Sequence, residues 1–111
     1  MVHLIDFFKT KFSREKYEND LEMVKKEENP KRLSYIARHN VFPKVRLEAI
    51  SRISEESVLA DIAKNDSNKN VRQAAIRKIS DEYVLEDISR NDSNRSVRVM
   101  ARNRLKELWH E

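Results

Sequence analysis

The chain has 111 residues, of which 38% are charged, and it contains no Gly, two Pro and no Cys. This length predicts a single domain, residues 1–111, that folds without the help of a metal or a disulfide. The lack of Cys excludes disulfides and thiolate metal sites. The shortage of Gly and Pro leaves few residues for tight turns and favours an all-α fold. The net charge of +4 is compatible with an acidic partner.

The N-terminal segment, residues 1–29, is predicted to form a pair of capping helices. Phe8 and Phe12 recur at helical spacing, and Ser13 is placed to begin a second helix in which Tyr17 packs against Phe12. We expect this pair to fold over the residues that follow. The segment is too short and too polar for a signal peptide or a membrane span, which predicts a cytoplasmic protein without membrane contact.

From residue 30 onward the sequence repeats with a period of 26 residues. The segment NDSNKNVRQAA at residues 65–75 returns as NDSNRSVRVMA at residues 91–101, and Val45 with Arg46 marks an earlier copy. A fixed period of this size is typical of stacked supersecondary units that cannot bury their apolar faces alone. The predicted units are residues 30–55, 56–81 and 82–111.

Each unit is predicted to be a hairpin of two short helices. Ser, Asn and Pro residues stand at regular places where helices would begin, because they cap the first turn or fit its backbone. The expected first-helix caps are Asn29, Ser54 and Ser80, and the second helices are expected to begin near Pro43, Asn68 and Asn94.

The second helix of each unit carries an apolar arc that includes one arginine. On a helical wheel of the middle unit, Arg72 lies within the arc formed by Val71, Ala75, Ile76 and Ile79. A charge in that place needs a partner, because breaking a buried ion pair costs about 3–5 kcal/mol. We expect a carboxylate in the preceding turn to supply a bidentate contact.

The inter-helix turn followed by Val-Arg and Ala resembles the HEAT-repeat and HEAT-like α-solenoid family, over about residues 30–109. The resemblance implies a right-handed α-α superhelix. It also implies a hydrogen-bonded ladder in which Asp66 pairs with Arg72 and Asp92 pairs with Arg98. The first unit departs from this pattern, because Asn40 stands opposite Arg46.

No arrangement of residues in the sequence indicates catalysis. The three histidines, His3, His39 and His110, are scattered and have no second ligand at metal-binding spacing. The acidic pairs follow predicted caps, where they favour the positive end of the helix dipole. We therefore expect no enzyme, no metal and no cofactor.

The surface of the second helices is the predicted functional site. A monomeric scaffold that binds a protein partner, with acidic character as one possibility, is the preferred interpretation. The predicted partner-binding residues are Arg52, Gln73, Arg77, Lys78, Met100 and Arg104.

Nucleic-acid binding is the alternative function. Basic residues recur in every unit, as Arg52, Lys78 and Arg104 and as Arg38, Lys64 and Arg90, and a basic surface can follow a phosphate backbone. Acids interrupt these columns and no aromatic residues alternate with them to stack bases. An ordinary solvated face also explains the charges.

Overall fold

The computed structural model describes the backbone of residues 4–109 and the side chains of residues 10–109. It is all-helical, with 78% of the chain in helices and no strand among the described residues. The seven helices are α1 (Leu4–Lys26), α2 (Pro30–His39), α3 (Pro43–Ile50), α4 (Glu56–Asn65), α5 (Lys69–Ile76), α6 (Glu82–Asn91) and α7 (Arg95–Trp109).

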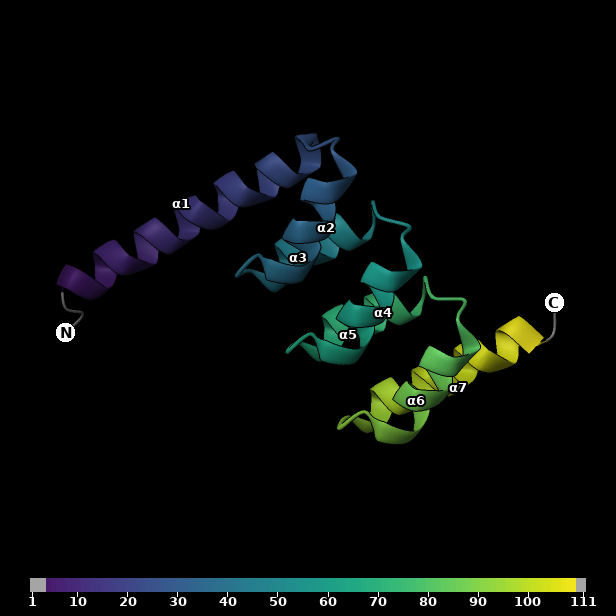
Figure 1. Ribbon diagram of the computed structural model, residues 1–111. Helices are drawn as coiled ribbons and strands as arrows, with labels where there is room; N and C mark the ends of the chain where they lie inside the picture. Colours follow the sequence, from purple (N-terminus) through teal and green to yellow (C-terminus); the bar gives the residue numbers. More distant parts are fainter. Residues whose placement is uncertain (1–3, 110–111) are drawn as a thin grey trace.

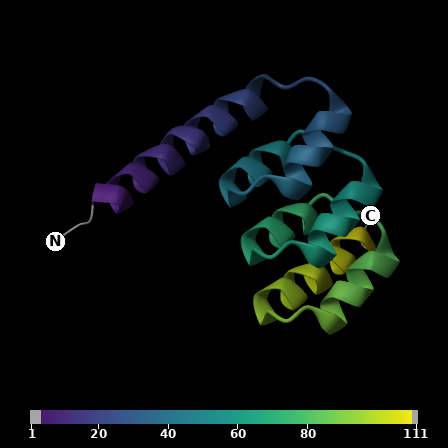
Figure 2. The same cartoon turned by 60° about the vertical axis from the view of Figure 1, so that its left-hand side comes forward.

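Six of the helices form three hairpins, α2–α3, α4–α5 and α6–α7, that stack in chain order (Figures 1 and 2). The first helices α2, α4 and α6 pack against one another in one layer. The second helices α3, α5 and α7 form the other layer, and α1 packs against α3 at its end. Among the described residues, the second-helix layer therefore contains one helix more than the first-helix layer, and α2 has no neighbour before it in its own layer.

Side-chain caps fix several helix starts. Asn29, Asn68 and Asn94 each accept hydrogen bonds from two backbone amides of the first turn that follows, as the sequence predicts. The prediction of Ser54 and Ser80 as caps is wrong by one residue. Glu55 and Asp81 occupy the capping position, and the Asp81 carboxylate accepts from the amides of Tyr83 and Val84.

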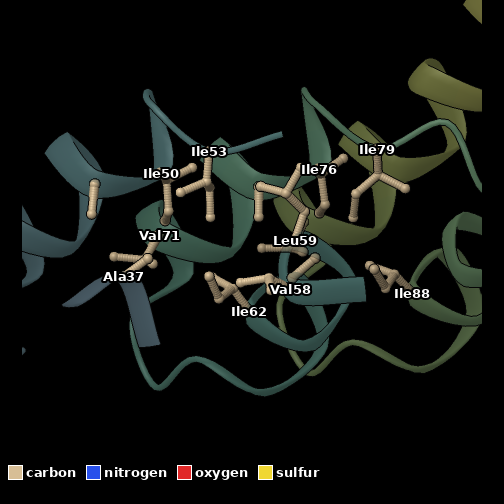
Figure 3. Packing of buried hydrophobic residues seen from close by; sticks show 14 of the residues in the cluster. Ala37, Ile50, Ile53, Val58, Leu59, Ile62, Val71, Ile76, Ile79 and Ile88 are labelled. Carbon is tan, nitrogen blue, oxygen red and sulfur yellow. The ribbon is translucent and has the colours of Figure 1, made fainter. Parts of the chain in front are cut away.

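The core is a layer of small and branched apolar side chains between the two helix layers. Val45, Val71 and Val97 are completely buried, and so are the Ala residues four positions after each of them. Side chains such as Ile62 from a first helix and Ile76 from a second helix gather in this layer, which continues from unit to unit (Figure 3). The small Ala side chains let neighbouring helices approach closely.

The predicted pair of N-terminal helices is one continuous helix, α1. Ser13 lies in its interior instead of capping a second helix, and the segment around it, SREK, contains no Gly or Pro to end a helix. The N-terminal half of α1 projects away from the stack instead of folding over it (Figures 1 and 2). Phe12, at 66% exposure, lies on this half, and the side chains of Leu4, Ile5 and Phe8 lie outside the described residues.

The C-terminal half of α1 takes the place of a second helix. Val24 precedes Ile50 by one period of 26 residues and is completely buried. Tyr17 packs edge-on against Phe42, with ring centroids 5.3 Å apart. The half-helix is therefore the second helix of an incomplete unit, which covers α3 but leaves α2 uncovered on the same side.

Arg14→Pro separates the two descriptions of α1. Proline is tolerated at the first position of a helix, where Arg14 would lie if Ser13 were a cap, but in a helix interior it costs about 3 kcal/mol. We expect the residues before position 14 to lose helicity, because an isolated helix of that length is marginal in water. Carbon chemical shifts measured by NMR report this directly. Unchanged shifts upstream of the substitution would contradict a continuous helix.

Candidate protein-interaction surface

Buried arginines join each unit to the next. The Nε and Nη2 atoms of Arg46 donate to both carboxylate oxygens of Asp66 at 2.9 and 3.0 Å. Arg72 holds Asp92 in the same way at 2.9 and 3.1 Å. Both guanidinium groups are buried, as their place on the apolar arc predicts. A bidentate carboxylate satisfies them.

The prediction that the Asp66 carboxylate holds Arg72 and the Asp92 carboxylate holds Arg98 is wrong, although both pairs are in hydrogen-bond contact. Arg72 contacts Asp66 only through the backbone carbonyl, which accepts from Nη1 at 2.9 Å, and Arg98 contacts the Asp92 carbonyl at 2.7 Å. The carboxylate comes from the following unit, 20 residues downstream. We call one arginine, the carbonyl of its own unit and the carboxylate of the next unit a rung of the ladder. Arg46 therefore has a complete rung even though Asn40 replaces the aspartate of its own unit.

Asn40 belongs to a reversed rung at the start of the stack. Its Nδ2 donates to the carboxylate of Asp20 at 2.9 Å, and Asp20 stands one period before Arg46. Burial by itself raises the pKa of Asp20, but hydrogen bonds from Asn40 and Lys16 and the charge of Lys16 outweigh it, so the pKa lies below its ordinary value. The polar contact between units thus continues onto α1 with donor and acceptor exchanged.

The basic column of Arg52, Lys78 and Arg104 contacts the preceding unit. Arg52 donates to the carbonyls of Val24 and Glu27 at the end of α1. Lys78 donates to the carbonyls of Ile50 and Ile53, and Arg104 donates to the carbonyl of Ile79 at 3.0 Å. These cations donate to carbonyls at and just after the ends of helices, where the regular helical hydrogen bonds stop. Burial lowers the pKa of Lys78.

The second basic column also pairs across units. Arg38 lies 3.2 Å from the carboxylate of Asp61, and Lys64 lies 3.4 Å from that of Asp87. A hydrogen bond from Asn91, together with that from Lys64 and its charge, outweighs burial and lowers the pKa of Asp87. Two acids that interrupt the basic columns in the sequence, Asp61 and Asp87, are therefore partners of this second column.

The remaining predicted partner-binding residues are Gln73, Arg77 and Met100. Gln73 and Met100 are half-buried, and Met100 packs against the core. Arg77 is exposed and ends α5. Of the six predicted residues, Arg52, Lys78, Arg104 and Met100 thus have contacts within the molecule. The role of all six in binding a partner stays a prediction.

The structure contains a groove that sequence reasoning missed. It lies between α1 and α2 and has a volume of about 610 Å³. Charged and polar side chains line it together with a few apolar ones, of which Met23 is 46% exposed and Tyr35 and Val41 are each 67% exposed. The ring of Tyr35 lies 4.6 Å from that of His39. The groove exists because α2 has no first helix before it.

A signal for the groove is present in the repeat itself. Met23, Tyr35 and Val41 stand one period before Ala49, Asp61 and Ser67. One further period on, the residues are again small or polar, namely Ala75, Asp87 and Ser93. Each groove residue is therefore larger or more apolar than its counterparts, although none of the three is buried.

Two kinds of feature are not found among the described residues: a cluster of metal ligands and a membrane-spanning helix. Within residues 10–109 no cluster of three His, Cys, Asp or Glu side chains could hold a metal ion, and His3 and His110 lie outside the described residues. No helix within residues 4–109 is long and apolar enough to cross a membrane.

Lys78→Met tests whether the basic column of Arg52, Lys78 and Arg104 stabilises the fold. The substitution keeps an unbranched side chain but removes the donor to two carbonyls, and leaving such groups unpaired costs about 1–3 kcal/mol. Arg77→Met is the matched control, because it removes the same charge from an exposed neighbour. Urea unfolding should show a clear loss for Lys78→Met and a change within about 0.5 kcal/mol for the control. Equal stabilities would mean that the column contributes nothing.

Comparison of the chain with protein-family models, curated proteins and solved structures finds no match. The function of this chain is therefore inferred from its own contacts, of which the buried rungs and the groove are the most specific.

Proposed function

We propose that the chain is a non-enzymatic interaction module of the HEAT-like type, a right-handed stack of helical hairpins that binds a protein partner. The period of 26 residues and the stacked hairpins support this proposal. The groove between α1 and α2 is the proposed binding site. We prefer it to the second-helix face, which the sequence alone indicates.

The departure of the groove residues from the repeat carries the proposal. Met23, Tyr35 and Val41 expose apolar surface at positions where later units have Ala, Asp and Ser. Their size does not serve the core, because large side chains that stabilise a fold are buried in it. Exposed apolar residues that gather in one hollow mark a site for a ligand or a partner.

The proposed occupant is an amphipathic helix of the partner. The groove lies beside α2 where a first helix of an earlier unit would pack, as α2 packs against α4 and α4 against α6. Helices dock into such grooves through apolar residues on one face.

The groove rim indicates the charge of that helix. Asp20 pairs with Lys16 at 3.0 Å, and Glu27 lies 3.7 Å from Arg32. Lys31 also lines the groove, and no carboxylate within residues 10–109 pairs with it. An acidic residue beside the apolar face of the partner helix would complement Lys31.

Nucleic-acid binding is less well supported by the contacts of the basic residues. Carboxylates pair with four of them, Arg38, Arg46, Lys64 and Arg72. The basic column of Arg52, Lys78 and Arg104 donates to carbonyls at helix ends. Binding of phosphates would have to compete with these contacts.

A variant that restores the repeat tests the proposal. Met23→Ala, Tyr35→Asp and Val41→Ser, combined in one chain, introduce residues that the fold already accepts one period later. We expect the melting temperature to change little, because exposed substitutions usually alter stability by less than about 0.5 kcal/mol. Affinity capture from the source cell, with and without nuclease, should lose the specific partner in the variant.

Tyr83→Ser is the matched control, because Tyr83 is 86% exposed outside the groove and Ser57 stands at its place one period earlier. The control should capture the same partner as the unaltered chain. Capture that is identical in all three proteins would refute the groove as the site. Loss of all captured material on nuclease treatment would favour nucleic acid.

A further inference from the structure

The last rung of the arginine ladder is half built. Arg98 donates Nη1 to the Asp92 carbonyl at 2.7 Å, as Arg72 does to the Asp66 carbonyl at 2.9 Å. In Arg72 the Nε and Nη2 edge then holds a carboxylate. Within residues 10–109 no carboxylate contacts that edge of Arg98, which is only half-buried. The guanidinium is thus anchored on one side and open on the other.

The second column ends in the same way. Arg38 and Lys64 each pair with an aspartate of the following unit. Arg90, one period after Lys64, is exposed, and none of the carboxylates described by the structure lies within ion-pair distance of it. The α6–α7 end therefore presents two arginines whose equivalents in both earlier units bind carboxylates.

The earlier units also show what fits these two arginines. α4 supplies Asp61 to Arg38 and its capping residue Asp66 to Arg46. α6 supplies Asp87 to Lys64 and its capping residue Asp92 to Arg72. In both cases the ligand is the C-terminal end of a helix with two aspartates five residues apart, in the sequences DIAKND and DISRND.

We propose that the α6–α7 end of the stack binds the C-terminal end of a partner helix that carries two aspartates at this spacing. The first carboxylate pairs with Arg90, and the second, at the end of the helix, takes the open Nε and Nη2 edge of Arg98. Fixing Nη1 on a backbone carbonyl orients the guanidinium in advance, which reduces the entropy lost on binding. Planar bidentate contact with a carboxylate then gives orientation as well as affinity.

A second copy of this chain does not supply that helix. At the two positions in question its first helix, α2, has Tyr35 and Asn40 in place of the aspartates, and α1 lies beside it. The equivalent acids of α4 and α6 are already paired. A second copy therefore offers no first helix with both aspartates free, and the proposed partner is a helix that does.

The end face differs from the internal interfaces in one further way. Arg102 stands where Ile76 is completely buried, and its guanidinium donates to the Ser89 carbonyl at 3.3 Å. Because less apolar surface is available there, electrostatic pairing takes a larger share of the recognition. Binding should therefore weaken as salt concentration rises.

A peptide with the sequence of residues 56–68, held helical by a side-chain lactam away from Asp61 and Asp66, is the probe. The Nε–Hε signals of arginine in the ¹⁵N-labelled full chain report contact at individual guanidinium groups. We expect saturable shifts for Arg90 and Arg98, and none with a peptide in which both aspartates are asparagine. Arg98→Gln and Arg90→Gln should each lower the affinity about tenfold, since hydrogen bonds to charged groups are strong.

Arg95→Gln is the matched control, because Arg95 is exposed at the start of the same helix, and it should leave the affinity unchanged. Arg90→Gln keeps the test decisive if Arg98→Gln unfolds, because Arg90 is exposed. The proposal is overturned if both peptides shift the signals equally, if the control weakens binding as much as Arg90→Gln, or if no shift occurs at millimolar peptide. It is also overturned if inorganic phosphate at the same concentration displaces the peptide.

Discussion

A buried guanidinium that finds its carboxylate only in the next unit is the constraint on which the stack depends. Arg46 and Arg72 lie on the apolar arcs of α3 and α5, where an unpaired charge would be costly. Each is satisfied by an aspartate that also accepts a hydrogen bond from the amide two residues later, which fixes the turn before the following second helix. The same aspartate therefore joins two units, fixes a turn and compensates a buried charge. A unit separated from its successor would leave its arginine without a carboxylate.

The pairing between units ends differently at the two ends of the stack. At the first end α1 contributes a buried Val24 and the reversed rung of Asp20 with Asn40, so that α3 is covered and α2 is left with an apolar groove beside it. At the other end Arg98 keeps the backbone contact that Arg72 makes, and within residues 10–109 neither Arg90 nor Arg98 pairs with a carboxylate. One end therefore presents apolar surface, whereas the other presents oriented charge, and the two proposed sites require partners of different chemistry.

The sequence predicts the repeat, the buried arcs and the need of Arg72 for a carboxylate, because each is a matter of periodicity or position around a helix axis. It does not predict which aspartate pairs with Arg72. A helical wheel shows where a side chain lies around one helix, but it does not show whether the preceding or the following unit supplies the carboxylate. The same limit explains why Arg52, Lys78 and Arg104 look like a free basic edge in sequence although they donate to the helix ends of the preceding unit. The continuity of α1 is missed because SREK is compatible both with a helix start and with a helix interior.

A double-mutant cycle on Arg72 tests the ladder between units most directly. Arg72→Met is combined with Asp92→Asn in one cycle and with Asp66→Asn in the other, and the free energies of unfolding are compared. Residues in direct ionic contact couple by up to about 3 kcal/mol, whereas side chains without a shared contact are additive within about 0.5 kcal/mol. The structure predicts that Arg72 couples strongly to Asp92 and much more weakly to Asp66, whose carboxylate it does not contact. Stronger coupling to Asp66 would place the rung within a single unit and contradict this account.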